Sequence, residues 1–211
     1  MRITSKGWLA EMGELIVILG GARSGKSNFA ERLALARGHE DVLYIATSQA
    51  LDEEMAERIA RHRAARPTGW RTIEEPLQPS LALSAAQEAV VVLDCMTVLV
   101  SNLLLTQGDP EQGAALPDAD VLEAQVEGEV RAILAAAGTR RGPTIVVSNE
   151  VGLGLVPPYP LGRIYRDVLG RANRLLVEAA SVAYLLIAGL PIDLKRLSAL
   201  DDPLGEDRGQ P

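Results

Sequence analysis

The sequence has little of several residue types, and each shortage excludes a class of protein. Its single cysteine, Cys95, cannot form an internal disulfide. Aromatic residues make up 3% of the 211 residues, and no apolar run approaches the roughly 20 residues of a membrane-spanning helix. The 21 basic residues are outnumbered by 28 acidic ones, which argues against nucleic acid or an anionic membrane as the main partner.

The remaining composition is that of one globular domain. Hydrophobic residues contribute 47% and charged residues 23% of the chain, enough for a sizeable core. We expect a domain over 13–200, an N-terminal extension over 1–12 in which Met12 is an alternative start, and a mobile tail over 201–211. Because residues 1–19 do not follow the signal-peptide pattern, the cytoplasm is the expected location.

The most informative stretch is GGARSGKS, residues 20–27, which follows the apolar run Leu15–Leu19 directly. Its glycines let consecutive backbone N–H groups turn towards one centre, Lys26 brings a charge to the outer phosphates of a nucleotide, and the Ser27 hydroxyl can ligate Mg²⁺. The helical pattern over Ser27–Arg37 would place the anion at a helix N-terminus. A glycine-rich turn without a ligand is disfavoured, because strand, motif and helix are in register. The predicted nucleotide-binding residues of the loop are Gly20, Gly21, Ala22, Arg23, Ser24, Gly25, Lys26 and Ser27, and Lys26 is also a predicted catalytic residue.

Apolar runs and helical patterns alternate along the chain. The predicted buried strands are Leu15–Leu19, Val42–Ala46, Val90–Leu93, Thr144–Val147 and Val182–Ile187. The predicted helices are Ser27–Arg37, Asp52–Ala65, Thr97–Thr106, Asp120–Ala137 and Leu161–Ala180, with a surface loop over Gly108–Asp118. This alternation predicts an α/β fold of the P-loop NTPase type, with a largely parallel sheet covered on both faces. Ligands of such sheets bind at the carboxyl ends of the strands.

An acidic residue, Asp94, ends the third apolar strand. P-loop enzymes hold Mg²⁺ opposite the loop serine with such a residue, so Ser27 and Asp94 are the predicted metal ligands. An acid after a strand is also a common helix cap, but the P-loop upstream favours the metal. Residues 148–154 fit either a phosphate sensor or substrate loop, or a simple turn. Residues 47–49, after the second strand, are equally ambiguous.

His62 lies in the predicted helix Asp52–Ala65, three residues after Ile59, where the apolar stripe meets a cluster of arginines at positions 58, 61, 63 and 66. A neutral imidazole can attack an α-phosphorus, and guanidiniums can hold the polyphosphate that leaves as pyrophosphate. The spacing alone favours a structural histidine on a solvated basic helix, so the nucleophile stays a hypothesis at this point.

Four segments together resemble the bifunctional adenosylcobinamide kinase and adenosylcobinamide-phosphate guanylyltransferase family of cobalamin biosynthesis. They are GGARSGKS, YIATSQALDEEMAERIARHRAARPTGWRTIEEP, VVLDCMTVLVSNLL and SNEVGLGLVP. The second is the most specific, since unrelated NTPases share the P-loop but not A-T-S-Q followed by R-I-x-x-H-R-x-x-R-P-x-x-W. The similarity extends over about residues 15–195.

The resemblance implies a RecA-like P-loop domain assembled as a homotrimer, with Mg²⁺ and two reactions. ATP or GTP would phosphorylate adenosylcobinamide, and GMP from GTP would then be transferred to the adenosylcobinamide phosphate. His62 matches the histidine that carries the guanylyl group, although Arg61 stands where some members have a second histidine. Further nucleotide contacts are implied for Ala46, Thr47, Ser48, Arg63, Ala64, Ala65, Arg66, Glu74 and Asp94.

Two other functions stay open on the sequence: a small-molecule P-loop kinase without nucleotidyl transfer, and a nucleotide-switched assembly protein. The two implied reactions also differ in geometry. Phosphorylation needs the acceptor hydroxyl in line with the leaving β-phosphate, whereas guanylylation presents the α-phosphorus to His62. We therefore expect that the arginine-rich helix moves relative to the P-loop, or that the nucleotide changes register between the steps.

Overall fold

The computed structural model describes residues 13–38, 40–50, 53–64, 66–108, 113 and 115–198, except for the side chains of Glu54, Met55 and Arg58. The predicted features at 1–12, Asp52, Ala65 and 201–211 lie outside these residues. The described strands are β1 (Leu15–Gly20), β2 (Val42–Ala46), β3 (Arg71–Glu74), β4 (Val90–Asp94), β5 (Thr144–Val147), β6 (Val182–Ile187) and β7 (Leu190–Asp193). The helices are α1 (Lys26–Gly38), α2 (Glu53–Ala64), α3 (Pro79–Ala85), α4 (Met96–Leu105), α5 (Ala119–Thr139), α6 (Pro160–Ala179) and α7 (Leu194–Leu197).

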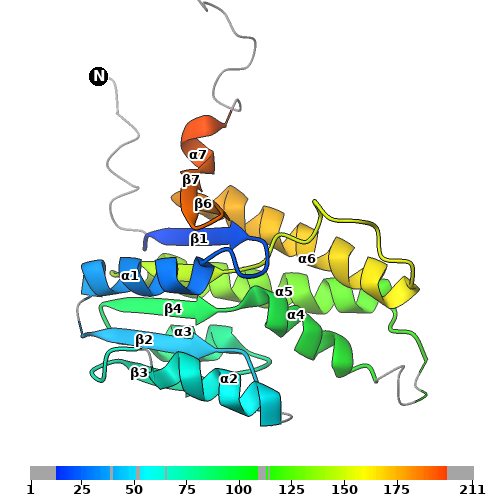
Figure 1. Ribbon diagram of the computed structural model, residues 1–211, viewed down its shortest axis with the longest axis horizontal. Helices are drawn as coiled ribbons and strands as arrows, with labels where there is room; N and C mark the ends of the chain where they lie inside the picture. Colours follow the sequence, from blue (N-terminus) through cyan, green and yellow to red (C-terminus); the bar gives the residue numbers. More distant parts are fainter. Residues whose placement is uncertain are drawn as a thin grey trace, which may run out of the picture.

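The strands form one sheet in the order β3-β2-β4-β5-β1-β6-β7, in which only the β6–β7 pair of the described strands is antiparallel. Side chains alternate between the two faces of each strand. Ile16 and Ile18 pack with Ala30 and Ala34 of α1, whereas the alternate strand residues pack with α3, α4, α5 and α6. Figure 1 shows α1 in front of the strands and α3 and α5 behind them.

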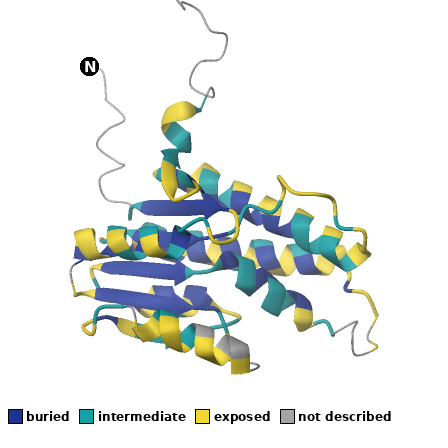
Figure 2. Ribbon diagram, in the orientation of Figure 1, coloured by how far each residue is buried: buried dark blue, intermediate teal, exposed yellow. Residues whose placement is uncertain are grey.

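Burial on both faces explains why the central strands are continuous apolar runs. β1, β2 and β5 are buried at every residue, as the dark blue strands in Figure 2 show. Parallel strands with helices on both faces have this composition. The predicted P-loop α/β fold is therefore confirmed. No helix among the described residues is long and apolar enough to cross a membrane.

The sheet has seven described strands where the sequence pattern predicts five. β3 has four residues with exposed ends, and β7 is an exposed edge strand that contains Pro191. Neither shows the apolar run of a buried strand, because an edge strand buries little surface. The short helices α3, with seven residues, and α7, with four, are missing from the prediction for a similar reason.

The pairing register brings the carboxyl ends of the strands into one row. Ala46 of β2 lies opposite Glu74 of β3 on one side and Asp94 of β4 on the other. β5 then separates β4 from the P-loop strand β1. Three residues predicted to contact nucleotide, distant in sequence, are neighbours at this edge, which lies to the right in Figure 1.

Asn102 of α4 fixes the loops at this edge. Its side-chain amide donates to the carbonyl of Thr47, at 2.8 Å, and to that of Pro76, at 2.9 Å. One side chain therefore ties the segments that follow β2 and β3 to the helix that follows β4. Removal of the Asn102 amide would leave both carbonyls without this donor, so the two hydrogen bonds together stabilise the loops at this edge.

We expect Asn102→Ala to lower the free energy of unfolding by about 1–3 kcal/mol, because two partly buried carbonyl acceptors lose their donor. Urea unfolding followed by circular dichroism measures the change. Ser101→Ala, a polar truncation next to it on α4, is the matched control and should stay within about 0.5 kcal/mol. Equal midpoints for the two variants would contradict the assigned role of Asn102.

Candidate active site

The P-loop, residues 20–27, joins β1 to α1 and is shaped by glycine. Gly25 has φ of +93°, a left-handed conformation that other residues rarely adopt. At Gly20 a Cβ atom would lie 2.7 Å from the Leu186 carbonyl oxygen and from Ser24 Oγ. Glycine is therefore required at both ends of the turn. The loop leads directly into the N-terminus of α1, where the free N–H groups of the first turn favour an anion.

Lys26 is buried in this loop. Its Nζ donates to the Gly21 carbonyl at 2.6 Å, so the ammonium group is held inside the cradle. Burial lowers the pKa of Lys26, while the charges of Cys95 and Asp94 act in the opposite direction. The ammonium group thus lies close to the end of β4 as well as to the loop, as a phosphate-binding lysine requires.

A hollow of about 160 Å³ lies beside the start of α1, between α2 and the carboxyl ends of β2, β3 and β4. Its lining combines basic, acidic, hydroxyl and apolar groups: Ser27, Tyr44, Ala46, Ser48, Ile59, His62, Arg63, Arg66, Thr72, Glu74, Asp94, Cys95 and Val98. It brings together eight of the predicted site residues: Ser27, Ala46, Ser48, His62, Arg63, Arg66, Glu74 and Asp94. We call this the main hollow.

Arg66 is the most tightly held cation of the main hollow. Its side chain is only 8% exposed, with Nε 3.5 Å from Glu31 Oε1. The guanidinium lies over the Tyr44 ring, 3.4 Å from the ring centroid, a stabilising cation–π contact. Burial raises the pKa of Glu31 although Arg66 lowers it. The position of Arg66 is therefore fixed by groups from α1 and β2.

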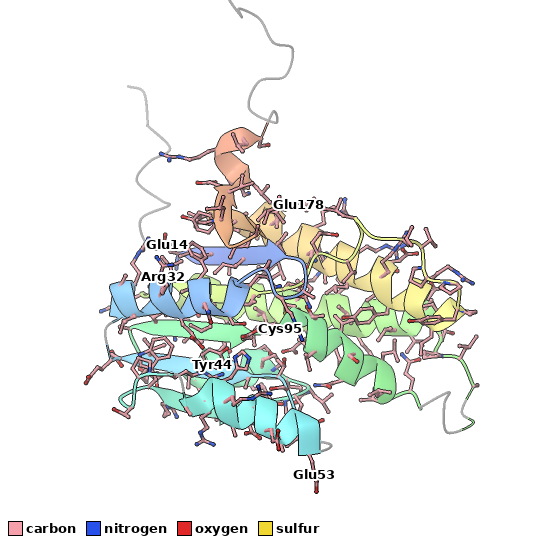
Figure 3. All side chains as sticks on the ribbon, viewed as in Figure 1. Glu14, Arg32, Tyr44, Glu53, Cys95 and Glu178 are labelled. Carbon is pink, nitrogen blue, oxygen red and sulfur yellow. The ribbon has the colours of Figure 1, made fainter. Side chains whose placement is uncertain are left out.

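Tyr44 also holds the carboxylate of Asp94. The phenol of Tyr44, labelled in Figure 3, donates to Asp94 Oδ2. Burial and the neighbouring Asp94 raise the pKa of Tyr44 well above its usual value, so the phenol stays a hydrogen-bond donor at neutral pH. One oxygen of Asp94 is thus occupied, and Oδ1 is left for another partner.

Some predicted residues have other surroundings. The Thr47 hydroxyl donates to the Cys95 carbonyl at 2.8 Å and accepts from the Cys95 N–H at 2.9 Å, so it joins two loops and does not line the main hollow. Ala64 is exposed and also outside the lining. Arg61 is exposed, and its Nε donates to the Glu57 carbonyl of its own helix. Ser148 is buried at the end of β5.

Five lining residues of the main hollow were not predicted as site residues, namely Tyr44, Ile59, Thr72, Cys95 and Val98, and neither was Glu31, which is paired with Arg66. Tyr44 stands inside an apolar strand, where its pattern is that of a core residue. Glu31 is the one acid of α1, and its spacing of four from Ser27 is the only signal that places the two on one helical stripe. Thr72 belongs to the unpredicted strand β3.

Magnesium fits this donor set. Ser27 and Asp94 both line the main hollow. Their hydroxyl and carboxylate oxygens are the kind of protein ligand that Mg²⁺ prefers. Within the described part of the chain, no group of three or more His, Cys, Asp or Glu side chains is placed to hold a metal ion. A magnesium ion at Ser27 and Asp94 would therefore take its other ligands from phosphates and water.

Comparison with known proteins gives the family. Residues 16–194 match the model of the cobinamide kinase / cobinamide phosphate guanyltransferase family. The bifunctional adenosylcobalamin biosynthesis protein CobU of Escherichia coli (strain K12) is 40% identical over 86% of this chain and 99% of its own. The bifunctional adenosylcobalamin biosynthesis protein CobP of Pseudomonas aeruginosa is 45% identical over 85% of this chain and 96% of its own.

Among solved structures, the flagellar accessory protein FlaH of Methanocaldococcus jannaschii covers 86% of this chain and 76% of its own at 16% identity, with a TM-score of only 0.41. The classification therefore rests on the family model, which extends over the P-loop, the His62 helix and the Asp94 strand, and on the sequence relatives. The chain belongs to the cobinamide kinase / cobinamide phosphate guanyltransferase family.

Proposed function

We propose that the protein phosphorylates adenosylcobinamide with ATP or GTP, and then transfers GMP from GTP to that phosphate through a guanylyl-histidine at His62. The observation that carries this proposal is the composition of the main hollow. It contains the imidazole of His62, two guanidiniums, and the proposed metal ligands Ser27 and Asp94. The proposed nucleophile and the groups suited to bind a polyphosphate therefore line the same hollow.

In the first reaction the acceptor hydroxyl oxygen attacks the γ-phosphorus. The bond from that phosphorus to the β–γ bridging oxygen breaks, the nucleoside diphosphate leaves, and the hydroxyl proton is lost to solvent or a base. Lys26 and the N–H groups of the P-loop are suited to stabilise the charge on the transferred group and on the leaving oxygen. The burial of Lys26 makes its interactions stronger than in water.

In the second reaction an imidazole nitrogen of His62 attacks the α-phosphorus of GTP. The bond to the α–β bridging oxygen breaks, pyrophosphate leaves, and a phosphoramidate forms. A phosphate oxygen of adenosylcobinamide phosphate then attacks the same phosphorus, the P–N bond breaks, and adenosylcobinamide-GDP forms with regeneration of the imidazole. Arg63 and Arg66 are placed to bind the pyrophosphate, because a guanidinium matches phosphate oxygens with two parallel N–H bonds.

A magnesium ion at Ser27 and Asp94 would supply charge neutralisation between the phosphates. The chain's own contribution is orientation: Tyr44 fixes Asp94, and Asp94 in turn favours the charged form of Lys26. Glu74, at the end of β3, its strand neighbour Ala46, and Ser48 are further proposed nucleotide contacts in the main hollow.

The assembly and location proposed for this enzyme are a homotrimer in the cytoplasm, with adenosylcobinamide, its phosphate and the two nucleotides as its small-molecule partners. The homotrimer comes from the family resemblance. The runner-up function, a P-loop kinase without nucleotidyl transfer, would leave His62 with a structural role. The clustering of Arg63 and Arg66 with His62 in one hollow favours the two-step enzyme.

His62→Ala should abolish guanylyl transfer and leave most of the kinase activity, because the imidazole is needed only in the second reaction. Incubation with α-³²P-GTP and Mg²⁺, followed by denaturing electrophoresis, should label the native protein with an acid-labile, alkali-stable group. The label should be absent from His62→Ala and present in Arg61→Ala, the neighbouring exposed control. A folded His62→Ala protein that keeps the label would refute the assigned nucleophile.

Lys26→Ala should lower the kinase kcat by about 10²–10³-fold, the usual cost of removing one preorganised charge from a transition state. Steady-state kinetics with ATP and adenosylcobinamide measure this change. Arg37→Ala, on the same helix but in an exposed pair with Glu14, is the control and should be active. A loss of less than threefold in Lys26→Ala would count against the role of the P-loop in phosphoryl transfer.

Asp94→Asn should raise the Mg²⁺ concentration needed for half-maximal activity in both reactions, because it removes a charged ligand. Tyr44→Phe should act in the same direction by less, up to about tenfold, since it deletes one hydrogen bond to the carboxylate. Mg²⁺ titrations of the kinase rate test this order, with urea unfolding curves to verify that the variants are folded. An unchanged Mg²⁺ dependence in Asp94→Asn would remove Asp94 from the metal site.

A further inference from the structure

A second hollow lies on the other side of the P-loop helix. It measures about 260 Å³ and is lined by Gly25, Asn28, Phe29, Arg32, Gly189 and Pro191. None of these residues lines the main hollow. We propose that this second hollow binds the nucleoside of the triphosphate used in the kinase step, whereas the main hollow binds the guanosine of GTP in the guanylyl step. This proposal rests on the proposed function.

The helical geometry of α1 separates the two hollows. Ser27 and Glu31, four residues apart, form one stripe of α1: Ser27 lines the main hollow, and Glu31 is paired with Arg66. Asn28 and Arg32 form the neighbouring stripe and line the second hollow. Arg32 and Tyr44 are labelled above and below α1 in Figure 3. The N-terminus of α1, with Lys26, therefore stands between two spaces that a nucleoside can occupy.

The direction in which a nucleotide lies along a P-loop favours the second hollow as the nucleoside site for phosphoryl transfer. Lysine and the metal serine of a P-loop serve the outer phosphates, and here these two residues lie towards Asp94 and the main hollow. A triphosphate with its γ-phosphate on that side has its α-phosphate and nucleoside directed away from it. Gly25 and Asn28, which flank Lys26 and Ser27, lead into the second hollow.

The walls of the second hollow are fixed and suit a purine. The Gly189 N–H donates to the Ser24 carbonyl at 3.1 Å, so the β6–β7 turn is attached to the P-loop itself. Phe29 packs edge-to-face on Tyr184, with ring centroids 5.1 Å apart. Pro191 adds apolar surface, and no ion pair within the described residues involves Arg32. An unpaired guanidinium can stack on a base.

The volume of the second hollow fits a site that holds the nucleoside alone, with the phosphates bound by the P-loop. Pockets for whole drug-sized ligands measure about 300–1,000 Å³, and the second hollow is slightly smaller. It needs to hold only the base and sugar, because the phosphates lie on the P-loop. The same loop then serves both reactions, and the nucleotide changes register by placing its nucleoside on one side of α1 or the other.

Photolabelling tests the site without relying on activity. Ultraviolet irradiation of the full-length protein with α-³²P-8-azido-ATP should label the tryptic peptides 27–32 or 175–195, in competition with ATP. Asn28→Trp, which fills the hollow from an exposed helix position, should lose this label, and Arg37→Ala should keep it. Label on the peptides that surround His62, or no ATP-competed label in the native protein, would overturn the proposal.

Kinetics separate this proposal from the proposed function. Arg32→Ala should raise the kinase KM for ATP by about three- to thirtyfold, with unchanged labelling of His62 by α-³²P-GTP. A parallel loss of ATP affinity and GTP labelling, or no change in the KM for ATP, would refute the second nucleoside site. A protein that takes the azide label in the second hollow but neither phosphorylates adenosylcobinamide nor labels His62 would instead refute the proposed function.

Discussion

The parallel register of β3, β2 and β4 is the constraint on which the rest of the site depends. Glu74, Ala46 and Asp94 are the last residues of three adjacent strands, and they lie in one row because Ala46 is paired with both neighbours. A slip of one residue would turn every side chain of a strand to the opposite face. Both faces of β2 and β4 are buried under helices, so such a slip would break two cores at once, and the site is as well defined as the core beneath it.

The charges of the site are held by groups that belong partly to that core. Tyr44 is buried in the core layer under α1, yet its phenol contacts Asp94 and its ring carries Arg66. An isolated buried cation would be costly, but Arg66 has an acid, Glu31, and a π-face against it. Asp94 and Arg66 therefore share one support, Tyr44, and in the proposed mechanism this couples the geometry of the two reactions.

The sequence predicts the P-loop, the main strands and the metal-side acid because each is a local pattern with a physical cause. Gly25, Lys26 and Ser27 are recognisable from spacing alone, and Asp94 from its place after an apolar run. His62 is different: its spacing favours a structural histidine, and only the resemblance of the longer segment around it indicates a nucleophile. Its place in the main hollow agrees with that second interpretation, while its reaction with GTP stays a prediction.

What the sequence does not predict depends on contacts between distant segments. β3 and β7 are too short and too exposed for an apolar pattern. They form strands because they pair with the edges of β2 and β6, respectively. Tyr44 looks like core, and its polar role follows only from Asp94, fifty residues away. The Thr47 hydroxyl is bonded to the backbone of Cys95, forty-eight residues away, and no local pattern indicates this contact.

In the proposed arrangement one P-loop lies between two nucleoside sites, so the two reactions must use it one after the other. The P-loop can hold the phosphates of one nucleotide at a time, so the two hollows cannot both be occupied by triphosphates. Kinase donor and guanylyl donor then compete for Lys26 even though their bases bind on different sides of α1. Once His62 carries the guanylyl group and pyrophosphate has left, the loop is free again for a kinase nucleotide. In the proposed mechanism, both activities therefore use one loop in turn.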